Sequence, residues 1–256
     1  MDRIRLIASD MDATLLDEQS QLPADFEETI HALAELGIRF APASGRPLYT
    51  LEAMFPALQD ELVFIGDNGG AIRWKGQNLF TSEMSPEGWR ALNRLTREQG
   101  DIAVLCGLES AYVERPFAVH DAVLRHFYTK IEYVDRLEDV TAPADKFTIY
   151  LPQHNAQQAY DTVYASQRSI YSVAVAGECW VDIMNPGVHK GAALQTLGQL
   201  WGLPSESMMA FGDTYNDAEM LRTAKYGFLM ENGSEPLRQK VPFLAPSHRE
   251  AGVMQV

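Results

Sequence analysis

Cysteine is scarce in this chain of 256 residues, which holds only Cys106 and Cys179. Two cysteines so far apart form neither a disulfide framework nor the closely spaced pairs of a zinc site, so two free thiols in a reducing compartment are expected. The six histidines have no ligand spacing either. The small disulfide-stapled proteins and the cysteine–histidine zinc proteins are therefore excluded.

Basic residues and long apolar runs are also lacking. The 21 lysines and arginines face 35 aspartates and glutamates, which gives a formal net charge of -14. Nucleic acids and anionic membrane surfaces need a basic footprint, so neither is an expected partner. No apolar run approaches the length of a transmembrane helix, and no apolar leader opens the chain. We expect a cytoplasmic protein, as a monomer or weak homo-oligomer.

What the chain does have is apolar content, at 46% hydrophobic residues. That is enough for a sizeable core, in one large domain or two moderate ones. We find no internal repeat and no low-complexity tract. The acidity serves solubility alone or reflects a carboxylate-rich metal site.

The two ends of the chain alternate strand and helix patterns. Near-continuous apolar runs such as residues 4–9 are typical of buried strands in a parallel sheet, and residues 23–36 form an amphipathic helix with proline in its first turn. Further strands are expected at 38–43, 62–65, 71–74, 78–81, 208–211, 226–229 and near 243, and further helices at 47–54, 189–201, 216–224 and 235–240. The pattern predicts an α/β fold, a doubly wound Rossmann-like core with a parallel sheet, from residues 1–83 and 185–256.

The pattern changes over residues 84–184. Ser85 and Pro86 are a helix-start signature for residues 86–99. Strands are expected at 102–106, 111–114, 131–134, 147–151, 170–176 and 180–183, with helices at 118–127 and 155–167. The segment predicts an inserted α+β domain, an antiparallel sheet with helices on one face.

Chemically informative residues follow four of the core segments. Asp10-Met11-Asp12 comes directly after the first strand, Ser44-Gly45-Arg46 after the second, Lys190 in the first turn of a helix, and residues 212–217 after a later strand. In an open α/β sheet, ligands bind outside the carboxyl ends of the strands. We therefore expect these segments to meet at one site.

Together the segments suit phosphoryl transfer. Asp10 could attack phosphorus, and Asp12 could protonate the leaving oxygen and then deprotonate water. Lys190 and Ser44 could hold the phosphoryl oxygens, with Asp213 as a ligand of Mg²⁺. Singly, each segment has a plainer interpretation: Ser44 as a helix cap, Lys190 as a solvated lysine, and Arg46 as either a substrate contact or a structural ion pair.

The four segments in this order resemble the haloacid dehalogenase superfamily, and more closely its Cof-type phosphatases with a large cap. The resemblance covers essentially the whole chain, and residues 10–15 and 212–217 carry its specific motifs. It implies Asp10 as nucleophile, Asp12 as general acid/base, and Mg²⁺ on Asp10, Asp12 through its carbonyl, and Asp213. It also implies phosphate contacts from Ser44, Gly45, Lys190, Asn216 and the amides near Met11. Asp217 would support the metal through water or orient Lys190.

The inserted segment occupies the position of the family's cap. The resemblance implies that this segment contacts the leaving group of the substrate and recognises it. Candidate contacts there are Arg115, His120, Glu178 and Trp180. Trp74, Trp89 and Trp201 are interpreted as packing residues.

One residue departs from the family pattern. Ala13 stands where the family usually has glycine. A left-handed backbone at this position would cost an alanine roughly 1 kcal/mol or more, whereas an ordinary backbone would make it harmless.

The sequence predicts a Mg²⁺-dependent phosphatase acting on small phosphate monoesters, sugar phosphates first, then nucleotide or cofactor phosphates. A phosphomutase or phosphotransferase on the same core and a non-catalytic sugar-phosphate sensor are the alternatives. Asp12 argues against a dehalogenase, which lacks that second acid.

Overall fold

The computed structural model describes residues 4–256, which divide into two compact units. The first contains the segments up to Ser44, Phe55–Phe80 and His189–Val256. The second contains Gly45–Met54 and Thr81–Val188. Residues 45–54, expected as part of the core, thus group with the inserted segment.

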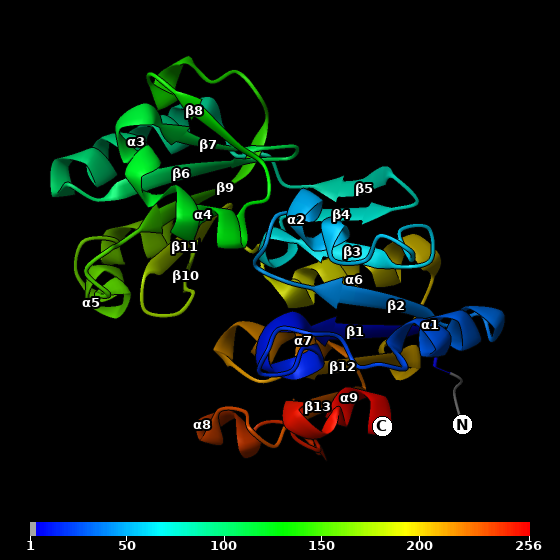
Figure 1. Ribbon diagram of the computed structural model, residues 1–256. Coiled ribbons are helices and arrows are strands. Elements are labelled where there is room, and N and C mark those ends of the chain that lie inside the picture. The colour runs from blue at the N-terminus through cyan, green and yellow to red at the C-terminus, as the bar shows by residue number, and fades with distance from the viewer. Residues whose placement is uncertain (1–3) are drawn as a thin grey trace. The chain divides into compact units, whose positions relative to one another are not determined.

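The first unit is built on an eight-stranded sheet, whose order is β14-β13-β12-β1-β2-β3-β4-β5 (Figure 1). Its strands are β1 (Leu6–Asp10), β2 (Arg39–Ala43), β3 (Val63–Gly66), β4 (Ala71–Trp74), β5 (Gln77–Thr81), β12 (Met208–Gly212), β13 (Tyr226–Met230) and β14 (Phe243–Ala245). Neighbours from β14 to β3 run parallel, and β4 turns back antiparallel to β3. This confirms the predicted α/β class.

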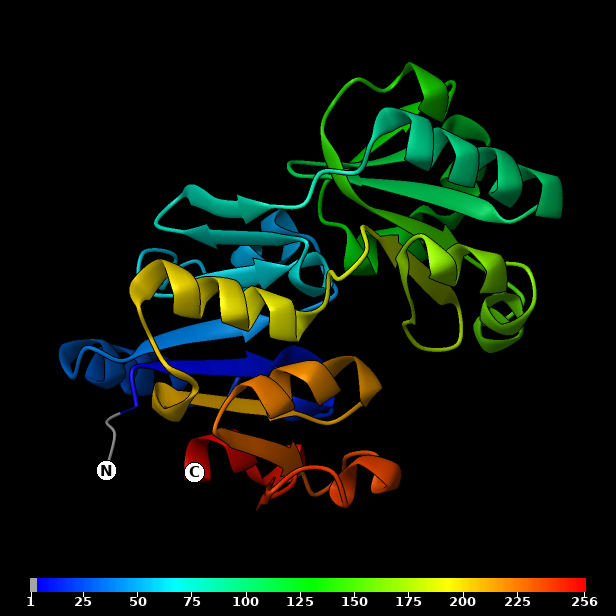
Figure 2. The same cartoon turned by 180° about the vertical axis from the view of Figure 1, so that it is seen from behind.

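Helices cover both faces of this sheet. They are α1 (Phe26–Glu35), α6 (Lys190–Trp201), α7 (Ala218–Thr223), α8 (Glu235–Arg238) and α9 (Gly252–Gln255). Figure 2 shows α6 and α7 in front of the strands, where Leu194 and Leu221 pack on the β1 side chains Leu6 and Ala8. Since alternate strand residues point to opposite faces, Ile7 points to the other side, where it lines an apolar space with Phe26 of α1 and Val253 of α9.

The second unit holds a six-stranded sheet of order β10-β11-β9-β6-β7-β8. Its elements are β6 (Ile102–Gly107), β7 (Ala111–Glu114), β8 (Ile131–Val134), β9 (Ala144–Tyr150), β10 (Ser172–Val175), β11 (Trp180–Met184), α2 (Leu48–Ala53), α3 (Pro86–Gln99), α4 (Asp121–Phe127) and α5 (Ala156–Asp161). Ser85 caps α3 through a hydrogen bond from the Gly88 N–H, as the sequence predicted, and Gly100 ends the helix at φ 76°.

Three expectations for this unit need correction. The sheet is not fully antiparallel, because β7 and β8 run parallel, joined by a crossover through α4. Helices are not confined to one face: Trp89 of α3 packs on one side, and Leu124 of α4 packs on the other. The helix expected at 155–167 ends at Asp161, and a separate 3-10 turn follows at Ala165–Ser169.

No helix within residues 4–256 combines the length and apolar character needed to cross a bilayer. Cys106 and Cys179 are both free thiols.

Candidate active site

Asp10 is the last residue of β1, and its position follows from strand pairing. It lies beside Ala43, the last residue of β2, while Ser9 lies beside Phe211 of β12. The three strands therefore end at the same edge of the parallel sheet, which is the edge where such sheets bind ligands. The Asp10 side chain is nearly buried, whereas Asp12, on the irregular turn Met11–Leu15, is exposed and Met11 is buried.

Lys190 reaches Asp10 from the first turn of α6. The preceding residue, His189, caps this helix by accepting a hydrogen bond from the Ala192 N–H at its Nδ1 atom. The Lys190 ammonium is fully buried and donates to Asp10 Oδ1 and to Asp217 Oδ1. A lysine without these carboxylates would be costly to bury, so the three side chains depend on one another.

Asp217 is held on both of its oxygens. Its Oδ1 atom accepts from Lys190 at 2.7 Å, and its Oδ2 atom accepts the backbone N–H groups of Asp213 and Thr214, each at 3.1 Å. Gly212 makes room for this turn, because a Cβ there would lie 2.4 Å from the Asp217 Cβ. The geometry favours Asp217 as an anchor of Lys190 and of the turn.

Asp10, Asp213 and Asp217 form a compact group whose ligand oxygens lie within 4.8 Å of one another. Burial, with the nearby Asp217 charge, raises the pKa of Asp10 to about 7 despite Lys190. Burial, with the charges of Asp10 and Asp217, raises the pKa of Asp213 to about 8. Burial opposes the charge on Lys190, but Asp10 and Asp217 outweigh it and raise the pKa of the lysine.

This donor set fits a divalent cation. Burial is the main cause of the raised pKa values of Asp10 and Asp213, and the charges of the neighbouring carboxylates, which one ammonium does not offset, add to it. Carboxylate oxygens are the ligands that Mg²⁺ takes in proteins, usually with waters and phosphate. Asp10 and Asp213 would hold the metal directly, since both oxygens of Asp217 already accept hydrogen bonds.

Ser44 follows β2 and is nearly buried. Its N–H donates to the Ile65 carbonyl, and its own carbonyl accepts from the Asn68 N–H, both at 2.9 Å. The core thereby fixes the backbone of Ser44. Gly45 and Arg46 belong to the second unit, and exposed Asn216 accepts a hydrogen bond from the Thr214 hydroxyl at 2.5 Å.

The turn after β3, residues 67–69, supports both Ser44 and the start of α6. Asp67, Asn68 and Gly69 all have positive φ, at 50°, 55° and 100°. Asn68 holds Ser44, and a Cβ at Gly69 would lie 2.6 Å from the His189 carbonyl oxygen. The Asp-Asn-Gly triplet signals such a turn, but its contact with α6 has no signal in the sequence.

Ala13 has the left-handed backbone that the sequence left open, with φ 58° and ψ 16°. Its carbonyl accepts a hydrogen bond from Asn232 Nδ2 at 2.8 Å, and Asn232 Oδ1 accepts from the His248 N–H at 3.0 Å. Asn232 was not predicted, because 219 residues separate it from Ala13. The strained turn that carries Asp12 is therefore held from the C-terminal segment.

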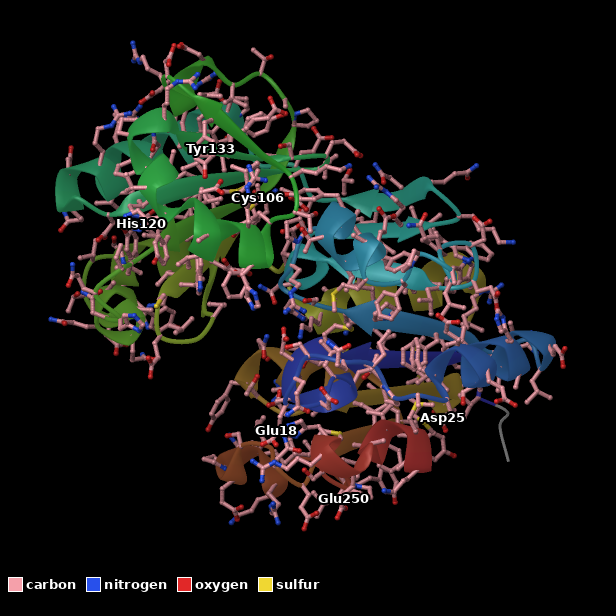
Figure 3. The ribbon with its side chains drawn as sticks, in the orientation of Figure 1. Glu18, Asp25, Cys106, His120, Tyr133 and Glu250 are labelled. Carbon is pink, nitrogen blue, oxygen red and sulfur yellow. The ribbon has the colours of Figure 1, made fainter. Side chains whose placement is uncertain are left out.

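The candidates in the second unit make structural contacts. Arg115 pairs with Asp135 at the surface, and Glu178 lies beside His154. His120, labelled in Figure 3, stacks edge-on to Tyr150, which packs against Trp180. Trp89 is buried, and Trp74 and Trp201 pack on each other, as expected for packing residues.

Comparison with known proteins identifies the family of the chain. The family model for haloacid dehalogenase-like hydrolases matches residues 7–256. The chain is 32% identical to the Escherichia coli K12 protein named 5-amino-6-(5-phospho-D-ribitylamino)uracil phosphatase YbjI, over 99% of this chain and 94% of that protein. It is 31% identical to a Cronobacter sakazakii protein named HMP-PP phosphatase, over 94% of this chain and 89% of that one.

Solved structures agree as well. The crystal structure of SMU.1108c from Streptococcus mutans UA159 superposes with a TM-score of 0.89 at 28% identity, covering 98% of this chain and 97% of that chain. The family match spans nearly the whole chain and includes all four strand-end segments. The chain belongs to the haloacid dehalogenase-like hydrolases.

Proposed function

We propose that this phosphatase hydrolyses small phosphate monoesters with Mg²⁺, through a phosphoryl group carried on Asp10. The observation that carries the proposal is the buried contact of Lys190 with Asp10, beside Asp213 and Asp217. It presents a carboxylate nucleophile next to a fixed cation, and the same carboxylate together with Asp213 is suited to a metal.

Two displacements at phosphorus account for the reaction. In the first, Asp10 attacks phosphorus, the bond to the leaving oxygen breaks, and Asp12 gives that oxygen its proton. In the second, water attacks the phosphoryl group on Asp10, Asp12 takes a proton from the water, and inorganic phosphate leaves. The Asp12 side chain is exposed, which suits it to transfer protons, because it must contact both the leaving group and water.

The remaining residues bind and orient. Lys190 favours the ionised form of Asp10 and offsets phosphoryl charge, and Ser44 binds a phosphoryl oxygen. Mg²⁺, when bound by Asp10 and Asp213, supplies positive charge that offsets the phosphate and the acids. The second unit selects the leaving group.

Sugar and polyol phosphates are the proposed substrates, followed by nucleotide and cofactor monoesters. The relatives named for a phosphoribitylaminouracil support a polyol phosphate attached to a heterocycle as a member of the test panel.

Phosphate release from a panel of monoesters, with Mg²⁺ and with chelator, tests the proposal. We expect metal-dependent release from several sugar and polyol phosphates. An isomerised sugar phosphate without free phosphate would identify a mutase, and binding without turnover would identify a sensor.

A further inference from the structure

We propose that Lys146 is a positioning residue for phosphate binding, which acts by fixing the turn that follows Ser44. The inference rests on the proposed function and adds a residue to it. Lys146 lies on β9, the strand between β11 and β6 in the sheet of the second unit. Its side chain is only 2% exposed, so its charge needs partners in place.

The Lys146 ammonium donates a hydrogen bond to the Gly45 carbonyl at 2.5 Å. This contact joins residues 101 positions apart in the sequence, and both lie in the second unit. A buried ammonium bonded to a carbonyl gives a short, charge-assisted hydrogen bond, which fixes the peptide more firmly than a neutral donor would.

Asp182 and Thr148 orient this lysine. Asp182 Oδ2 lies 3.7 Å from Lys146 Nζ, and Asp182 Oδ1 accepts from the Thr148 hydroxyl at 2.7 Å. Thr148 is opposite Asp182 in the β9–β11 ladder, and the thiol of Cys106 on β6 lies 3.7 Å from the Thr148 hydroxyl. The lysine is therefore held by neighbouring strands and does not swing freely.

Further contacts tie the rest of residues 45–54 to the same unit. The Thr50 hydroxyl accepts from the Thr129 N–H at 3.0 Å, and the Lys130 ammonium lies 5.7 Å from the centre of the Tyr49 ring. Helix α2 is thus anchored in its middle, and Lys146 anchors the residue from which the segment starts.

The Lys146 contact matters chemically because Gly45 directly follows Ser44. The chain passes from the first unit to the second at the bond between these two residues. The core holds the Ser44 backbone through Ile65 and Asn68, whereas Lys146 holds Gly45. The Ser44 hydroxyl and the Gly45 N–H are the groups proposed for phosphate, and Lys146 bonds the carbonyl of the peptide that directly follows them. Small misplacement of binding groups reduces rate and affinity strongly, so the Lys146 contact sets how well these groups meet a phosphoryl oxygen.

The test compares Lys146→Met, Lys146→Arg and the control Lys240→Met, each beside wild type. Lys240 is an exposed lysine of the first unit, so its variant removes the same charge without touching residues 45–54. The probes are inorganic phosphate, titrated calorimetrically in Mg²⁺, and p-nitrophenyl phosphate turnover. Thermal melting reports folding.

We expect Lys146→Met to weaken phosphate binding and raise KM by about tenfold or more, with a smaller fall in kcat. Lys146→Arg should recover part of the affinity, and Lys240→Met should match wild type. A folded Lys146→Met protein with wild-type affinity and KM would overturn the inference.

Thr148→Val is the second variant, in case the methionine variant does not fold. It removes the hydroxyl that orients Asp182 and keeps the side-chain shape, so we expect a smaller loss of phosphate affinity in the same direction. Unchanged affinity in this variant would also overturn the inference. Wild type that binds phosphate but hydrolyses no ester would contradict the proposed function while leaving the binding test valid, and wild type that binds no phosphate would overturn both.

Discussion

Lys190 and Asp217 form a fully buried ion pair, with 2.7 Å between Lys190 Nζ and Asp217 Oδ1. Asp217 is in turn fixed by two backbone N–H groups, so the turn after β12 determines where Lys190 lies beside Asp10. Breaking a buried pair leaves an uncompensated charge, which makes Asp217 as sensitive a residue as those that touch substrate.

Asp217→Asn tests that relationship. The amide keeps the shape but removes a charge beside Lys190, so we expect kcat to fall about 10- to 100-fold, the range typical of lost supporting contacts. Steady-state kinetics measures this, with exposed Asp60→Asn as the control for the same exchange in the same unit. A kcat close to that of wild type would show that Asp217 does not position Lys190.

Ala13→Gly should stabilise the protein. At φ 58° the alanine carries left-handed strain of about 1 kcal/mol or more, which glycine lacks, although glycine also gains freedom in the unfolded chain. We expect a gain of up to about 1 kcal/mol in the free energy of unfolding by denaturant titration. The control Ala32→Gly, on an exposed position in the interior of α1, should lose about 1 kcal/mol. Equal losses in both variants would contradict the strain at Ala13.

Gly69→Ala tests the support that the turn after β3 gives to α6. A Cβ at Gly69 would lie 2.6 Å from the His189 carbonyl, directly before Lys190. We expect lower stability and lower kcat, because the start of α6 must shift. Gly76→Ala is the matched control, since Gly76 also has positive φ but nothing within 4 Å of the new Cβ. It should lose about 1 kcal/mol and keep its activity. If both variants lost the same stability and kept the same activity, the close approach of Gly69 to His189 would not support α6 as proposed.

Asp101 predicts a pH dependence of stability. Burial raises the pKa of Asp101 above 3.8, although the Tyr164 hydroxyl, donating at 3.0 Å, acts in the opposite direction. An acid whose pKa is raised by folding binds protons more tightly when folded, so its contribution to stability is lost as pH rises above about 3.8. Asp101→Asn should therefore gain stability relative to wild type as pH rises from 3.8 toward neutrality, in melts across pH. A gain in the stability of Asp101→Asn that appeared only as pH falls would contradict a raised pKa of Asp101.

Sequence patterns predicted the core better than the inserted unit, for a physical reason. Strands such as β1 are buried on both faces and read as apolar runs, whereas the β7–β8 crossover depends on Leu124 packing on a face that local periodicity does not identify. The helix pattern over 155–167 also overran the break at Asp161, because apolar spacing does not mark where tertiary packing ends a helix.

The candidate site likewise has a part that sequence patterns predict and a part that depends on tertiary contacts. Asp10, Asp213 and Asp217 meet because the parallel strands β1 and β12 end at one edge of the sheet, a rule that can be applied to a sequence. Lys190 joins them from the first turn of α6. The contacts of Asn232 with Ala13 and of Lys146 with Gly45 join distant segments through side chains, and no local pattern predicts them.

The central claim is that Asp10 is the nucleophile of a metal-dependent phosphatase. Phosphate release from the best monoester of the panel, measured for wild type and Asp10→Asn with Mg²⁺ and with chelator, tests it most directly. We expect release by wild type in Mg²⁺ only, and none by a folded Asp10→Asn protein, because an amide at this position is a poor nucleophile. Substantial release by Asp10→Asn, or equal release by wild type in chelator, would contradict it.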